Sequence, residues 1–118
     1  MKLLEIKKLL DCKCIMGKEY IDEYDVEYAF GCDLMSDVLA FSNHETLLLT
    51  GLTNPQVIRT AEMMDINAIV FVRGKRPDDK TIELAEKYQK VLLCTRKILY
   101  TSCGILYKHG LKGVTIND

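Results

Sequence analysis

This sequence of 118 residues contains little proline, no marked excess of positive or negative charge and no long apolar run. The two prolines and seven glycines mark no linker, so we expect one domain that spans residues 1–118. The net charge is −1, whereas a domain that binds nucleic acid usually carries a basic excess. No run approaches the roughly 20 consecutive apolar residues of a membrane-spanning helix. The sequence therefore predicts neither nucleic acid nor a membrane as a partner.

The N-terminus and the cysteines also lack specialised patterns. The first eight residues mix charged with apolar side chains and do not form a signal peptide, so we expect a cytoplasmic protein. The five cysteines should be reduced thiols in that compartment. None of them forms Cys-x-x-Cys, and neither His44 nor His109 completes a metal-binding spacing. No metal ion and no other cofactor is therefore predicted, and the cysteines are expected to pack as small apolar residues.

What the sequence does contain is a strand–turn–helix pattern that occurs three times within about residues 46–109. The apolar runs and the helical patterns that follow them occupy residues 46–51 and 56–64, residues 68–72 and 78–89, and residues 91–94 and 97–108. The apolar runs do not alternate with polar residues, which is typical of strands covered by helices on both faces of a parallel sheet. The sequence therefore predicts a single α/β domain with a mostly parallel sheet and flanking helices.

Before the repeat, the pattern predicts a short helix and two strands. The apolar residues at positions 3, 6, 9 and 10 share one face of a helix. Residues 12–16 are expected to form a brief strand that ends at the turn Gly17-Lys18. In residues 24–30, apolar and polar side chains alternate, as they do in a strand with one buried and one wet face. We expect that strand to lie at the edge of the sheet or in a small separate sheet.

Asp33 is expected to cap a second helix that runs to about Phe41. The side chains expected to face inward from this helix are Leu34, Met35, Val38 and Leu39. Asp33 and Asp37 lie four positions apart, so an alternative is that both carboxylates help to hold a magnesium ion together with oxygens of a substrate. A cap at Asp33 and a solvent-facing Asp37 explain both residues without a metal.

The candidate ligand site lies where the repeated strands end. The carboxyl ends of parallel strands meet at one edge of a sheet, where open α/β proteins usually bind their ligands. The candidate residues, which occupy the turns after the first two strands, are Thr50, Gly51, Thr53, Asn54, Arg73, Gly74, Lys75 and Arg76. We expect the two turns to face the same crevice.

Each turn also has a simpler interpretation. The cations of the second turn, beside a helix start, could bind a phosphate or carboxylate, or they could be solvated charges that pair with Asp78 and Asp79. Gly51 could allow a ligand close to the backbone. Asn54 could donate to that ligand, although a helix cap before Pro55 explains this residue equally well.

Three stretches, GCDLMSDVLAF at residues 31–41, LLLTGLTNPQ at 47–56 and VFVRGKRPD at 70–78, carry a resemblance to a known family. Over residues 26–111 the chain resembles the stand-alone, single-domain members of the DRTGG domain family. The residues that name the family differ here, because Thr53-Asn54 replaces an Asp-Arg pair and Arg73-Gly74-Lys75 replaces Thr-Gly-Gly.

The family is similar to the N-terminal domain of HPr kinase/phosphorylase, and it accompanies nucleotide-sensing CBS domains in some pyrophosphatases. The resemblance implies a regulatory or oligomerisation module without catalysis of its own.

We therefore expect a non-catalytic regulatory or ligand-binding module that senses an anionic small molecule, such as a nucleotide or a phosphorylated metabolite. The alternative is an enzyme or accessory factor in phosphoryl or redox metabolism. Against a kinase of the HPr type, the phosphate loop Gly-x-x-x-x-Gly-Lys-Ser/Thr is absent, since Gly74-Lys75 is followed by Arg76. No catalytic residue is predicted.

A homodimer is expected, because a domain of this size leaves apolar surface exposed and a two-fold contact covers it most simply. The surfaces considered are the strand at residues 24–30, the helix near Met35 and Leu39, and the tail at residues 111–118. Val114 and Ile116 form the apolar centre of that tail, which either pairs as a short strand or packs on a partner subunit.

Overall fold

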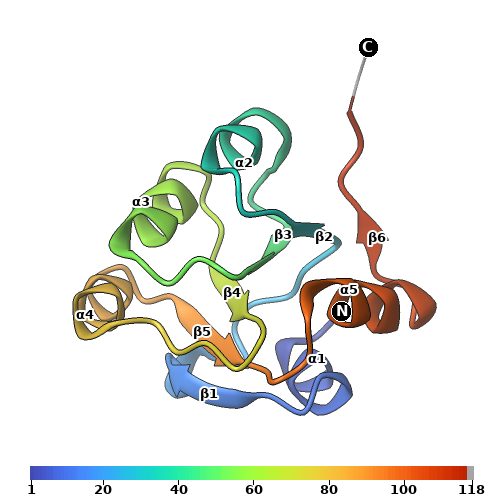
Figure 1. The fold of residues 1–118 in the computed structure, drawn as a ribbon, viewed down its shortest axis with the longest axis horizontal. Helices are drawn as coiled ribbons and strands as arrows, with labels where there is room; N and C mark the ends of the chain where they lie inside the picture. Colours follow the sequence, from blue (N-terminus) through green and yellow to red (C-terminus); the bar gives the residue numbers. More distant parts are fainter. Residues whose placement is uncertain (117–118) are drawn as a thin grey trace.

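Six strands form one mixed sheet between two layers of helices (Figure 1). The computed structural model describes residues 1–116. The strands are β1 (Lys13–Met16), β2 (Tyr28–Gly31), β3 (Thr46–Thr50), β4 (Ala68–Phe71), β5 (Val91–Cys94) and β6 (Lys112–Gly113). Their order across the sheet is β1-β5-β4-β3-β2-β6, and only the contact between β1 and β5 is antiparallel. The predicted mostly parallel α/β sheet is confirmed.

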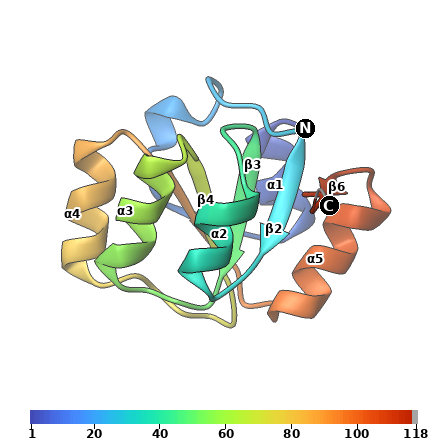
Figure 2. The ribbon, with the colours of Figure 1, turned by 90° about the horizontal axis from the view of Figure 1, so that it is seen from above.

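The helices cover both faces of this sheet. They are α1 (Leu3–Leu9), α2 (Met35–Phe41), α3 (Pro55–Met63), α4 (Asp79–Lys87) and α5 (Leu99–Lys108), with a short 3₁₀ helix, η1, at Lys18–Tyr20. Helices α2, α3 and α4 lie on one face, and α1 and α5 lie on the other (Figures 1 and 2). Leu47 and Leu49 of β3 pack toward α1 and α5, whereas Leu48 between them packs toward α2 and α3. Because successive side chains enter two cores, the apolar runs do not alternate. No helix within residues 1–116 is long and apolar enough to cross a membrane.

Side chains cap the helices that follow β3 and β4. The Asn54 Oδ1 atom accepts a hydrogen bond from the Gln56 amide at 3.0 Å, and Pro55 occupies the first turn of α3, where its missing N–H removes no bond. The Asp78 Oδ1 atom accepts from the Thr81 amide at 2.8 Å at the start of α4. The helix-cap interpretation of Asn54 is confirmed.

The interpretation of Asp33 as a helix cap is wrong. Helix α2 begins at Met35, Leu34 occupies the cap position, and no side chain caps the helix there. The inward face is also narrower than predicted, because Leu34 is 58% exposed and Leu39 is 38% exposed. Val38 is fully buried and Met35 packs beside it. The seven residues of α2 present only a thin apolar stripe to the sheet.

The alternating segment at residues 24–30 was predicted to be one edge or separate strand, and only its second half is a strand of the sheet. Val26 is buried, and its amide donates to the Met1 carbonyl at 3.0 Å. Tyr24 and Val26 pack with the α1 side of the core, which explains their apolar alternation without a strand. β2 starts at Tyr28 and lies between β3 and β6, so it is neither the edge strand nor part of a second sheet.

The tail forms a short strand, one of the two alternatives that its sequence left open. Lys112 and Gly113 pair with Tyr28 and Ala29 of β2, and the Val114 amide donates to the Ala29 carbonyl at 3.3 Å. Ile116 is 62% exposed. Residues 117–118 of the predicted tail lie outside the described residues.

Candidate functional site

Asp33 ties the end of β2 to the turn after β3. Its Oδ1 atom accepts one hydrogen bond from the Thr50 hydroxyl at 2.8 Å and a second from the Gly51 amide, also at 2.8 Å. The Thr50 Oγ1 atom in turn accepts from the Leu52 amide at 3.2 Å. Hydrogen bonds to an ionised carboxylate are stronger than those between neutral groups. Thr50 and Gly51 are therefore held in place by the protein itself.

Arg73 reaches across from the turn after β4 and lies against Gly51. Its Nη2 atom is 3.5 Å from the Gly51 carbonyl oxygen, and a Cβ atom at position 51 would lie 2.7 Å from Nη2. The predicted close approach to Gly51 is thus made by an arginine of the same chain. The two turns meet at this contact.

The turn after β4 is fastened to the turn after β5 through its backbone. Arg73 and Gly74 both have left-handed backbone angles, with φ values of 64° and 69°. The Arg73 amide donates to the Lys97 carbonyl and the Gly74 amide to the Thr95 carbonyl, each at 2.9 Å. These two amides are thereby used within the protein, so an anion at this turn would be held by side chains.

Thr53 and Asn54 position two helices. The Thr53 carbonyl accepts from the Thr81 hydroxyl at 2.8 Å, which links the loop after β3 to the first turn of α4. The Asn54 side chain caps α3, as described above. Neither residue lines the cavity that contains Gly74.

Gly74, Lys75 and Arg76 line a hollow of about 390 Å³ between the ends of β4 and β5 and the connection from α1 to β1. The other residues that line it are Asp11, Cys12, Lys13, Ile15, Cys94, Thr95 and Arg96. We call this cavity the basic hollow, after its four cationic residues Lys13, Lys75, Arg76 and Arg96. Asp11 is the single acidic residue that lines it.

The cations of the basic hollow form no ion pair with any of the described residues. Within residues 1–116, the ion pairs are Lys2–Asp25, His44–Glu45 and Lys90–Glu62, and none of them includes a cation of the hollow. The expected alternative of pairing with Asp78 and Asp79 is therefore not what the structure shows. The Asp78 carboxylate is engaged by Thr81 instead, and these hydrogen bonds lower its pKa.

The two cysteines of the basic hollow are neutral. Burial raises the pKa of the Cys12 thiol to about 12, and it raises the pKa of Cys94 to about 11 despite the nearby charge of Arg76. A thiol with so high a pKa is a poor nucleophile at neutral pH, because the thiolate is the reactive form. Together with Ile15, these thiols give the hollow an uncharged part beside its cations.

Sequence reasoning found three of the residues that line this hollow and missed Lys13 and Arg96. Arg96 lies in the third polar turn, directly after β5, so the argument applied to the first two turns could have included it. Lys13 comes into position only because β1 pairs antiparallel with β5, where Lys13 lies opposite Cys94. No pattern in the sequence predicts that contact.

The magnesium alternative at Asp33 and Asp37 gains no support from the geometry. Both acceptor bonds described for Asp33 involve its Oδ1 atom and hold the turn after β3. Among residues 1–116, no group of three or more His, Cys, Asp or Glu side chains is placed to hold a metal ion.

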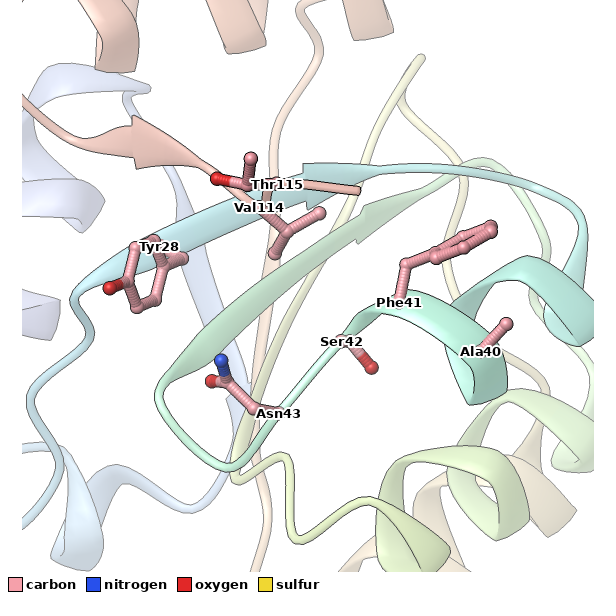
Figure 3. Close-up of a pocket in the computed structure, with 7 residues that line it drawn as sticks. All are labelled: Tyr28, Ala40, Phe41, Ser42, Asn43, Val114 and Thr115. Carbon is pink, nitrogen blue, oxygen red and sulfur yellow. The ribbon is translucent and has the colours of Figure 1, made fainter. Parts of the chain in front are cut away.

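A second hollow, of about 510 Å³, lies beside Tyr28 at the amino end of β2 (Figure 3). It is lined by Tyr28, Ala40, Phe41, Ser42, Asn43, Val114 and Thr115. The Ser42 hydroxyl donates to the Val38 carbonyl within the last turn of α2. The lining residues carry no charged side chain, so this hollow offers no electrostatic attraction to an anion.

No protein-family model matches the sequence, and no curated protein matches it either. The fold does match a crystal structure of the CBS and DRTGG domains of the regulatory region of Clostridium perfringens pyrophosphatase, complexed with the activator diadenosine tetraphosphate. The TM-score is 0.71 at 14% sequence identity, and the match covers 89% of this chain but 45% of the other. The chain is thus similar in fold to part of a regulatory region, and it spans less than half of the chain that it matches.

Proposed function

We propose that the protein is a non-catalytic, ligand-binding regulatory module of the DRTGG type, and that its basic hollow binds an anionic small molecule. The observation that carries the proposal is a set of four cations around one cavity at the carboxyl edge of the sheet, none of which forms an ion pair within residues 1–116. Open α/β proteins usually bind ligands at that edge. The structural neighbour is a regulatory region complexed with a nucleotide polyanion, which supports the same class of ligand.

The shape and charge of the hollow favour a nucleotide or a phosphorylated metabolite. Arg76 and Arg96 can each present a planar guanidinium fork to a phosphate, while Lys13 and Lys75 add point charges. The thiols and Ile15 offer an uncharged surface to the rest of the ligand. All four cations are exposed side chains, and together they attract an anion more strongly than a single charge would.

The competing function, an enzyme or accessory factor in phosphoryl or redox metabolism, lacks the parts that its chemistry needs. The sequence contains no phosphate loop. The raised pKa values of Cys12 and Cys94 keep both thiols protonated at neutral pH, which disfavours nucleophilic catalysis in the hollow. We therefore propose binding without turnover.

The decisive experiment is a thermal-shift titration with ATP, diadenosine tetraphosphate and acetyl phosphate as probes. A ligand that binds only the native state at about 100 times its Kd stabilises it by roughly 2.7 kcal/mol, so the melting temperature should rise. The shift should disappear in the double variant Arg76→Ala/Arg96→Ala. It should persist in Lys80→Ala/Lys87→Ala, which removes two exposed cations of α4 outside the hollow.

Two outcomes would count against the proposal in different ways. If none of the anions shifts the wild-type protein, anion binding itself is refuted. If the Arg76→Ala/Arg96→Ala variant keeps the full shift, the protein binds anions elsewhere and the basic hollow is the wrong site. Added salt should weaken the shift, because the contacts are electrostatic and partly solvated.

The proposed module also assembles as a homodimer. This part of the proposal is supported by exposed apolar side chains that the single chain does not cover, among them Tyr100 at 85% and Tyr107 at 75% exposure. The predicted dimer surface at residues 24–30 is poorly suited to it, since β3 pairs with one side of β2, β6 pairs with Tyr28 and Ala29 on the other side, and Val26 is buried.

A further inference from the structure

Gly104 is not explained by the fold of a single chain. It lies in the interior of α5, and its backbone does not have the positive φ found at Gly17, Gly74 and Gly110. A Cβ atom added at position 104 would meet no atom of residues 1–116 within 4 Å. Glycine weakens a helix relative to alanine, so a helix interior normally avoids it. Neither the backbone conformation nor packing among the described residues requires glycine here.

Two exposed tyrosines flank this glycine on the outer face of α5. With 3.6 residues per turn, Tyr100, Gly104 and Tyr107 lie on one face, and Thr101 and Lys108 border them. All five residues are exposed. A hollow of about 540 Å³ lies along this surface, lined by Tyr100, Thr101, Cys103, Gly104, Ile105, Tyr107 and Lys108. We call the five exposed residues the α5 face.

The charge of the α5 face differs from that of another exposed helix surface. Lys108 is the single charged residue among the ten of α5, whereas α4 carries five charged residues, Asp79, Lys80, Glu83, Glu86 and Lys87. Figure 2 shows α5 at one end of the molecule, with its outer side free of other elements. A solvated helix usually carries charges on its outer side, so the nearly uncharged α5 face is suited to contact with protein.

We propose that the α5 face binds the α5 face of a second copy of this chain around a two-fold axis. The proposal deepens the homodimer of the proposed function by naming its surface. If the helices cross in antiparallel orientation between Cys103 and Gly104, Tyr100 lies level with Tyr107 of the partner subunit. The symmetry produces this aromatic contact twice. The missing Cβ atoms at Gly104 let the two helix axes approach closely.

Electrostatic interactions also favour a second copy of this chain as the partner of the α5 face. In this antiparallel arrangement, the positive end of each helix dipole lies beside the negative end of the other, so the two dipoles attract each other. The two Lys108 side chains lie at opposite ends of the contact, separated along the axis by roughly 13 Å at 1.5 Å per residue, which exceeds the screening length of about 10 Å at 0.1 M salt. The centre of the contact contains no like charges. A second copy therefore fits both the shape and the charge of the α5 face.

Sedimentation equilibrium over a dilution series of the full chain tests this assignment. Wild-type protein should show twice the 13.5 kDa of one chain, and Gly104→Glu should show the mass of one chain. Circular dichroism should confirm that Gly104→Glu stays folded, because position 104 is exposed and a Cβ atom there meets no atom of residues 1–116 within 4 Å. Met63→Glu is the control, since Met63 is 72% exposed on α3, which covers the opposite face of the sheet. This control should remain a dimer.

Disulfide cross-linking is a second test of the α5 face that does not require a charged substitution at the contact. Mild oxidation should link Gly104→Cys into a covalent dimer, whereas Met63→Cys and wild type should stay unlinked. If Gly104→Glu remains as dimeric as wild type, or if dimeric Gly104→Cys does not cross-link, the α5 face is the wrong surface and the homodimer stands. A wild-type protein that is monomeric at every concentration refutes the homodimer and this surface together. Anion binding by the basic hollow is a separate measurement that neither result alters.

Discussion

The guanidinium group of Arg73 lies against Gly51, so that the turns after two neighbouring strands are in direct contact. A Cβ atom at position 51 would lie 2.7 Å from Nη2 of Arg73 and 3.1 Å from its Nε atom. The predicted ligand-binding residues divide into three groups, of which Thr53 and Asn54 position the helices α3 and α4. Thr50, Gly51 and Arg73 hold the turns together, whereas Gly74, Lys75 and Arg76 face the basic hollow.

The first prediction concerns that contact. Gly51→Ala should destabilise the protein by about 1 kcal/mol, because the new methyl group displaces the end of a flexible arginine rather than rigid backbone. In an Arg73→Ala background, the same substitution should cost much less. Urea unfolding of the four proteins in a double-mutant cycle measures the difference. Additive effects of the two substitutions would show that Arg73 does not occupy this position.

The second prediction concerns Asp33 as a support for the turn after β3. Asp33→Ala removes the acceptor for the Thr50 hydroxyl and the Gly51 amide, so it should cost about 1–3 kcal/mol of unfolding free energy. Hydrogen exchange should accelerate at the Gly51 amide. Asp37→Ala, on helix α2, is the matched control and should leave that amide protected. If exchange instead accelerates only at the first amides of α2, Asp33 acts as the helix cap that the sequence suggested.

The third prediction compares two glycines with left-handed backbones. Gly17 has φ of 85° and Gly74 has φ of 69°, so alanine at either site should cost about 1–2 kcal/mol for its conformation. At position 17 the Cβ atom would also collide with the Lys90 carbonyl oxygen and lie 2.8 Å from the Val91 Cα atom, whereas at position 74 it meets nothing within 4 Å. Gly17→Ala should therefore lower the melting temperature well beyond Gly74→Ala. Equal shifts would contradict the close packing of Gly17 on β5.

The structural role of a residue could be predicted from the sequence when its contacts are with residues close in the chain. It could not be predicted when its contacts are with residues far away in the chain. The repeated strands and helices were predicted because two cores bury successive side chains of each strand, as Leu47 and Leu48 show. The cap at Asn54 is local, since it bonds to Gln56 two positions ahead. Such features leave a pattern that can be recognised without the structure.

A prediction was wrong where the same sequence pattern fits both a contact with nearby residues and a contact with distant ones. Asp33 precedes a helix, as a cap would, but its partners Thr50 and Gly51 lie 17 and 18 positions away. Lys13 joins the basic hollow through the pairing of β1 with β5, which no spacing in the sequence reveals. The fold class was therefore predictable from periodicity, whereas the composition of the hollow depended on tertiary contacts.

The last prediction is a loss of stability in alkaline solution that originates from the thiols of Cys12 and Cys94. Folding raises the pKa of Cys12 from 9.0 to about 12 and that of Cys94 from 9.0 to about 11, in both cases chiefly through burial. A group whose pKa is raised on folding contributes stability that is complete below its unfolded pKa and is lost as the pH rises toward its folded pKa. The window for this loss is therefore from about pH 9 to about pH 11 or 12.

Urea unfolding at a series of pH values across this window is the measurement. The free energy of unfolding of the wild-type protein should fall as the pH rises, because the unfolded chain releases thiol protons that the folded chain retains. In Cys12→Ala/Cys94→Ala the fall should be shallower, even if that variant is less stable at pH 7. Cys32→Ala is the control, since it leaves the thiols of Cys12 and Cys94 in place. An identical pH dependence in the wild type and the double variant would show that Cys12 and Cys94 ionise as readily in the folded protein as in the unfolded chain.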